Sequence, residues 1–178
     1  MQSIKYWDFN FDHSSWDLNK EDTQELLQDT FIGSVKRQMI SDVPIGSYLS
    51  EGIDSGGIVA VLASNIEKLA TFTCGFDVTQ ASGMELDFDE RSRAEIISGR
   101  YFTKHYEVIL NAKDLEWCID DVIYHLNEPI VGMSYPNYYI SELAGKYVKV
   151  VFFGTGGDEL FAGYPWRYIT PQNVKTTF

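Results

Sequence analysis

Residues 48–57 read Tyr48-Leu49-Ser50-Glu51-Gly52-Ile53-Asp54-Ser55-Gly56-Gly57, and they separate two apolar runs of different character. The run before them, 43–49, is short and partly β-branched, which predicts a buried strand. The run after them, 58–65, predicts a helix. Small residues, hydroxyl groups and one carboxylate therefore occupy a strand-to-helix turn. Such a turn directs backbone N–H groups and the positive end of a helix towards a ligand, and this favours an anion.

The composition limits the kinds of partner that this turn can serve. A length of 178 residues with 44% hydrophobic residues is enough for one domain with a packed core. The net charge of −12 argues against a nucleic-acid partner, and it means that a triphosphate needs local compensation from Mg²⁺ or from backbone donors. No apolar run reaches membrane-spanning length and the first residues lack a signal-peptide core, so we expect a cytoplasmic protein with no membrane partner.

Strand-like and helical segments alternate along most of the chain. Residues 1–19 are aromatic and irregular, and they predict a linker or an N-terminal arm packed on the domain. In the predicted helix 20–40, apolar residues recur at helical spacing and predict core packing; they are Leu26, Leu27, Phe31, Val35 and Met39. Further strands are expected at 70–77, 105–110 and 148–153, and further helices at 90–99, 111–126 and 138–146.

This alternation predicts an α/β fold with a mainly parallel twisted sheet and helices on both faces, of Rossmann-like type. Ligands in such folds bind beyond the carboxyl ends of the strands, which places the loops 50–57, 74–77 and 154–158 at one edge. Asp54 and Asp158 would then supply hard oxygen ligands for a Mg²⁺–phosphate site. Two plainer interpretations stay open. In one, the first loop only joins strand to helix, and in the other, Asp158 with Glu159 only stabilises a helix start.

The loop 50–57 lacks the spacing and the lysine of a Walker A motif. It resembles the phosphate loop of the ATP pyrophosphatases (PP-loop enzymes), with Ser50, Gly52, Asp54 and Ser55 matching. Other segments follow in the order seen in the synthetase domain of asparagine synthetases: Tyr6-Trp7-Asp8, Val43-Pro44-Ile45-Gly46, Thr73-Cys74-Gly75-Phe76, Asp89-Glu90, Asn127-Glu128-Pro129 and Gly156-Gly157-Asp158-Glu159-Leu160-Phe161-Ala162-Gly163-Tyr164. The resemblance covers almost the whole chain.

The resemblance implies a fold of the adenine nucleotide alpha hydrolase type, with residues 20–178 as a C-terminally incomplete, ATP-binding synthetase domain. It implies a pyrophosphate site formed by Ser50, Gly52, Asp54 and Ser55. Leu49 and the backbone of Cys74 and Gly75 would flank adenine and ribose, and Phe153 and Gly154 would contact the nucleotide through backbone groups. Asp54 and Asp158 would act in catalysis as ligands of Mg²⁺.

The activity that the resemblance implies is that of a C–N bond-forming ligase that uses ATP and releases AMP. A carboxylic acid would become an acyl-adenylate, and ammonia would then displace AMP. Aspartate would be the acid, and ammonia would come from glutamine through a glutaminase domain or subunit absent here. Two alternatives stay open: an enzyme that adenylates another acid, as β-lactam synthetase does, or a non-catalytic nucleotide-binding module.

Three positions depart from the family pattern. Glu51 replaces a glycine of the loop, and a non-glycine residue in left-handed geometry would cost roughly 1–2 kcal/mol. Its carboxylate would also repel polyphosphate unless it helps to hold a cation. Thr155 stands where the family has an acidic residue, and threonine cannot act there as a general base. Asn127 replaces an aspartate.

Overall fold

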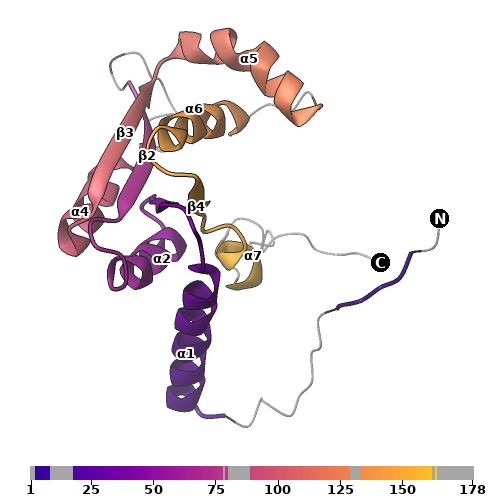
Figure 1. Cartoon of the computed structure of the whole chain (residues 1–178), viewed down its shortest axis with the longest axis vertical. Helices are drawn as coiled ribbons and strands as arrows, with labels where there is room; N and C mark the ends of the chain where they lie inside the picture. The colour runs from indigo at the N-terminus through magenta and orange to yellow at the C-terminus, as the bar shows by residue number, and fades with distance from the viewer. Residues whose placement is uncertain are drawn as a thin grey trace, which may run out of the picture.

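The computed structural model describes residues 3–8, 18–77, 79, 89–128, 133–161 and 163. One sheet contains the strands β1 (Ile45–Tyr48), β2 (Ala70–Phe76), β3 (Lys104–Leu110) and β4 (Val150–Phe152). The strand order is β3-β2-β1-β4, and every neighbouring pair is parallel. The predicted α/β fold with a parallel sheet is therefore confirmed (Figure 1).

Helices cover both faces of the sheet. On one side, α1 (Lys20–Gln38), α2 (Ile53–Ala63) and α4 (Arg91–Tyr101) contribute to a core whose buried members are Val35, Leu49, Val59, Leu62, Leu69 and Ala94. On the other side, α6 (Ser134–Gly145) packs on β2 and β3, with α5 (Ala112–Leu126) next to it (Figure 1). The buried members of this second core are Phe72, Ile140, Ala144 and Val148.

Local signals explain where two of the helices begin. Asn111 caps α5 in a complete capping box with Asp114, which satisfies backbone N–H groups at both positions. Helix α6 begins at Ser134, four residues before the expected Tyr138. Pro136 lies in its first turn, where a residue without an N–H costs no helical hydrogen bond.

Helix α1 corrects one expectation. Leu26, Leu27 and Phe31 are exposed, and only Val35 and Met39 at the C-terminal end pack in the core. The helix projects away from the sheet, so its first turns do not reach the core formed by the described residues (Figure 1). The described parts of the N-terminal segment, 3–8 and 18–19, are also exposed, and the domain boundary at residue 19 stays a prediction.

Several expected features lie outside the described residues. They are most of the residues between the expected strand 70–77 and the expected helix 90–99, Pro129 of the Asn127-Glu128-Pro129 segment, and Ala162, Tyr164 and 165–178 at the C-terminal end of the predicted domain. Within the described part of the chain, no helix is both long and apolar enough to cross a membrane.

Candidate functional site

The sheet reverses its direction of growth at β1. The chain passes from β1 to β2 and β3 on one side, and β4 is later added on the other side. The loops after β1 and β4 therefore lie next to each other at the carboxyl ends of the strands, where α/β sheets bind ligands. A pocket of about 330 Å³ opens at this position. The pocket is lined by both loops, by the end of β2 and by the N-terminal half of α6.

Most of the predicted site residues line this one pocket. They are Leu49, Ser50, Gly52, Asp54, Ser55, Cys74, Phe153, Gly154 and Asp158. Gly75 lies in β2 but is not among the lining residues. Thr155, one of the three departures, also faces the pocket. The fold thus brings together segments that are about a hundred residues apart in the sequence, as the strand pattern predicted.

The first loop is held by hydrogen bonds between its serines. The Oγ atoms of Ser50 and Ser55 are 2.7 Å apart, and the Ser50 backbone N–H donates to Ser55 Oγ at 3.1 Å. Helix α2 begins at Ile53, earlier than expected, so Asp54 and Ser55 lie in its first turn. Gly52 at the N-cap contributes no side-chain cap. The first backbone N–H groups of α2 are therefore available to an anion in the pocket.

The second loop lies directly on Asp54. A β-carbon added to Gly157 would lie 2.1 Å from Asp54 Oδ2, and one added to Gly154 would lie 3.1 Å from the Ser55 backbone nitrogen. The backbone N–H of Asp158 hydrogen-bonds the Asp54 carboxyl group. A side chain on Gly157 would occupy the space of the Asp54 carboxylate, and one on Gly154 would press tightly on the start of α2. These contacts place Asp158 beside Asp54.

The pair of aspartates fits a divalent cation of the hard, oxygen-binding type. Burial raises the pKa of Asp54, and the neighbouring charge of Asp158 raises it further. A bound cation would relieve this repulsion. Among the described residues, no group of three or more His, Cys, Asp or Glu side chains is arranged to hold a metal. A cation at this pair would therefore take its other ligands from water and from phosphate oxygens, as Mg²⁺ commonly does.

Glu51 is accommodated without the strain that the sequence predicted. Among the described residues, positive φ angles in non-glycine residues occur at Lys68, Phe102 and Asn127, and Glu51 is not one of them. The expected left-handed geometry at this position is therefore wrong. Asn127 adopts that geometry instead at the C-terminus of α5, a conformation that asparagine tolerates better than most residues.

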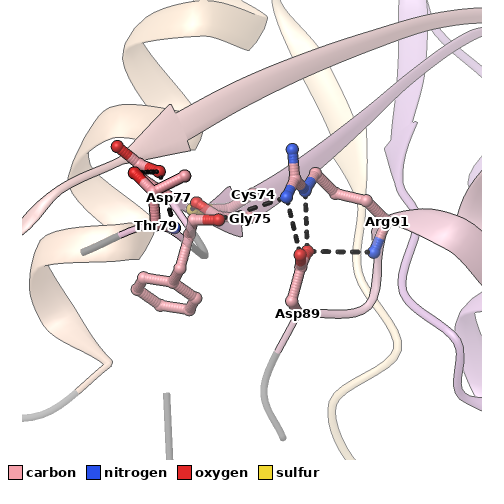
Figure 2. A network of polar contacts seen from close by, with 7 residues as sticks. Cys74, Gly75, Asp77, Thr79, Asp89 and Arg91 are labelled. Carbon is pink, nitrogen blue, oxygen red and sulfur yellow. Dashed lines mark hydrogen bonds and ion pairs between the residues drawn. The ribbon is translucent and has the colours of Figure 1, made fainter. Parts of the chain in front are cut away.

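An arginine supports the end of β2, where the family resemblance places adenine and ribose. Arg91 Nη2 donates to Asp89 Oδ2 at 2.6 Å and to the Phe76 backbone carbonyl at 3.1 Å (Figure 2). Its side chain crosses Gly75, where an added β-carbon would lie 2.3 Å from Arg91 Cδ. Gly75 is thus required by the close approach of Arg91. Burial raises the pKa of the adjacent Cys74 thiol to about 12, and the charge of Asp89 adds to the shift.

Several residues that line the pocket were not predicted as site residues. Glu90 at the N-cap of α4 is one, and Met133, Pro136, Asn137 and Ile140 of the α6 segment are others. Asp89-Glu90 was recognised as a motif, but its place beside the pocket depends on how α4 packs against the end of β2. The late prediction of the α6 start hid Met133, Pro136 and Asn137, whereas Ile140 was placed in the predicted helix but not beside the pocket.

Comparison with known proteins identifies a family for this chain. The model of the asparagine synthase family matches residues 26–178. The chain is 36% identical over 164 residues to a putative glutamine-hydrolysing asparagine synthetase of Methanocaldococcus jannaschii, covering 89% of this chain and 30% of that protein. It is 32% identical over 150 residues to asparagine synthetase 1 of Bacillus subtilis, covering 84% and 22% of the two chains.

The chain spans less than a third of the length of these curated relatives. Among solved structures, the ammonia-dependent NAD synthetase of Campylobacter jejuni aligns with a TM-score of 0.44 at 15% identity. That alignment covers 83% of this chain and 61% of the other.

Proposed function

This chain belongs to the asparagine synthase family, and we propose that it is the ATP-binding part of a synthetase that converts a carboxylate into an amide through an acyl-adenylate. The observation that carries the proposal is the meeting of two loops in one pocket. The serine-bearing start of α2 and the glycine-rich loop after β4 enclose a space that suits a phosphate chain, with Asp54 and Asp158 at its border.

We assign separate parts of ATP to separate parts of the pocket. Ser50, Gly52 and Ser55, with the first N–H groups of α2, would hold the β- and γ-phosphates. Leu49, Phe153 and the backbone of Cys74 and Gly154 would flank adenine and ribose. Gly75 would act indirectly, through Arg91, by keeping the end of β2 in place.

Asp54 and Asp158 would hold Mg²⁺, whose charge would offset the charge that develops on the leaving pyrophosphate. In the proposed first step, a carboxylate oxygen of the substrate attacks the α-phosphorus of ATP. The bond from that phosphorus to the bridging oxygen breaks, and pyrophosphate leaves. The loop serines and backbone N–H groups contribute by fixing the pyrophosphate in line with the attack.

The second step is attack of ammonia on the activated acyl carbon. A C–N bond forms, the bond from that carbon to the AMP oxygen breaks, and protons pass from nitrogen to solvent. Thr155 lies on the pocket where the family pattern has an acidic residue, and its hydroxyl cannot serve as a general base. We therefore expect the proton that the attacking nitrogen loses to pass directly to solvent rather than to a side chain at this position.

We propose aspartate as the acid, a glutaminase domain or subunit as the source of ammonia, and the cytoplasm as the location. The names of the relatives, which are glutamine-hydrolysing asparagine synthetases, support the choice of acid and of ammonia source. We propose no nucleic-acid or membrane partner, in keeping with the net charge of −12.

The test is release of pyrophosphate and AMP from Mg·ATP by the full 178-residue chain, supplied with ammonia and one acid at a time. Aspartate-dependent release supports the proposal. Loss of release in Asp158→Asn would show that the reaction takes place in this pocket. Release that depends on another acid instead favours a relative of the β-lactam synthetase kind. Binding of Mg·ATP without release for any acid contradicts catalysis and identifies a nucleotide-binding module.

A further inference from the structure

The pocket has an unusual balance of charge for a site that binds phosphates. Four carboxylates line it, from Asp54, Glu90, Asp158 and Glu159. None of the lining residues within the described ranges is a lysine or an arginine. A polyphosphate entering this space meets negative charge on several sides. Any further carboxylate turned into the pocket would oppose binding.

Glu51 lies in the loop beside the pocket, so its carboxylate could turn into this space, but its side chain is directed elsewhere. All other residues of the segment 48–55 line the pocket, and Glu51 alone does not. Its Oε1 atom forms an ion pair with Arg93 Nη1 at 3.2 Å. Arg93 lies in the first turn of α4, outside the pocket, so the pair links the phosphate loop to a neighbouring helix.

The backbone of Glu51 faces a second acidic group. Its N–H hydrogen-bonds the carboxyl group of Glu90, which lines the pocket. Burial raises the pKa of Glu90, and the charge of Glu51 raises it further. The carboxylates of Glu51 and Glu90 therefore lie close together beside the loop, and Arg93 is the cation that pairs with Glu51.

We infer that Arg93 is a positioning residue of the nucleotide site: its ion pair with Glu51 holds that carboxylate out of the phosphate pocket. Arg93 acts through Glu51 and does not contact the nucleotide. The inference rests on the proposed function, because it concerns affinity for the phosphates of ATP. It also explains how the loop carries a glutamate at this position.

The size of the effect follows from the exposure of the two side chains, which is 70% for Arg93 and 40% for Glu51. Exposed ion pairs are weak, so we expect Arg93→Ala to lower the affinity for Mg·ATP roughly three- to fivefold. The same change in a Glu51→Gly background should have little effect, since no carboxylate is left to turn into the pocket. Arg93→Lys should restore most of the affinity.

The experiment is a four-variant cycle on the full chain: wild type, Arg93→Ala, Glu51→Gly and the double variant. Calorimetry measures binding of Mg·ATP and, separately, of adenosine. Arg100→Ala, at the other end of α4, is the matched control for loss of an arginine from this helix. Adenosine carries no phosphate, so its affinity should stay the same in all four proteins, whereas a merely structural lesion would lower it.

The inference is confirmed by a loss of Mg·ATP affinity that requires Glu51, spares adenosine and is absent in Arg100→Ala. It is overturned by an equal loss in both backgrounds, by no loss, or by a parallel loss for adenosine, while the proposed function stands in each of these cases. If Glu51→Gly and the wild type both fail to bind Mg·ATP, the proposed function fails, and the inference fails with it.

Discussion

The carboxylate of Asp54 lies against the backbone of Gly157, so closely that a β-carbon on Gly157 would be 2.1 Å from Asp54 Oδ2. This contact joins the loop after β1 to the loop after β4. The two loops come from strands that are neighbours in the sheet but distant in the chain. The position of Asp54 is thus determined by tertiary structure as well as by its own helix.

Gly157→Ala should damage the site more than the fold. The φ angle of Gly157 is not positive, so alanine is tolerated by the backbone, and the lesion comes from the added methyl group. A displaced Asp54 should lower the affinity for Mg·ATP between roughly tenfold and a hundredfold. Gly145→Ala, where nothing lies within 4 Å of an added β-carbon, is the control. Equal affinities in the two variants would contradict the role given to this contact.

Asp54→Asn should stabilise the protein without ligand while it weakens Mg²⁺-dependent binding. The folded-state pKa of Asp54 is raised, so its ionisation costs folding free energy, and this cost appears as the pH rises through 3.8 towards the folded value. Removal of the charge should therefore raise the free energy of unfolding at pH 7 and leave it unchanged at pH 3. Urea denaturation at the two pH values measures both.

The control for this prediction is Asp42→Asn, which removes an exposed carboxylate from the segment before β1. It should change stability little at either pH. Lower stability of Asp54→Asn at pH 7 would show that the carboxylate is a net stabilising group, against our interpretation of its neighbours.

Gly75→Ala should destabilise the end of β2. The new β-carbon would lie 2.3 Å from Arg91 Cδ, in the stem of the side chain rather than at its flexible end. Arg91 would have to move and would lose its bond to the Phe76 carbonyl (Figure 2). We expect a loss of about 1–3 kcal/mol in the free energy of unfolding, the usual cost of overpacking.

Gly99→Ala is the matched substitution for this measurement. Nothing lies within 4 Å of its added β-carbon, and the residue sits inside helix α4. Alanine there should stabilise the protein by about 0.5–1 kcal/mol through helix propensity. Urea denaturation of both variants tests the pair, and a neutral Gly75→Ala would refute the close approach of Arg91.

Both cysteines should react slowly with thiol reagents in the folded protein. With a pKa of about 12, Cys74 is ionised in roughly one molecule in ten thousand at pH 8. Cys118 is buried, and burial raises its pKa as well. Ellman's reagent should therefore label the native chain over hours and the urea-unfolded chain within minutes. Rapid labelling of one native thiol at pH 8 would contradict the described environment.

Much of the site was predictable because strands and phosphate loops leave local signals. The alternation of apolar runs located the four strands that the structure describes, and Ser50, Asp54 and Ser55 of the predicted loop 50–57 line the candidate pocket. Asp158 was assigned to the same edge because parallel strands end together. These predictions depend on short stretches of sequence, each of which carries its own pattern.

What could not be predicted depends on packing between distant elements. The predicted geometry of Glu51 was wrong. The glycine of the family pattern at this position suggested a strained, left-handed backbone, whereas the φ angle of Glu51 is not positive and its carboxylate is paired with Arg93. The apolar spacing of α1 predicted burial, but spacing does not tell how far a helix extends beyond the sheet. Leu26 and Leu27 are exposed for that reason.

The most direct test is calorimetric binding of ATP to the full chain, with and without Mg²⁺, for the wild type and for Asp158→Asn. The proposed site predicts that the wild type binds ATP with Mg²⁺ and that affinity falls by roughly tenfold or more when either the cation or the Asp158 carboxylate is removed. Binding that is unchanged by both removals would contradict a cation held by Asp54 and Asp158, and absence of binding in every case would contradict the nucleotide site itself.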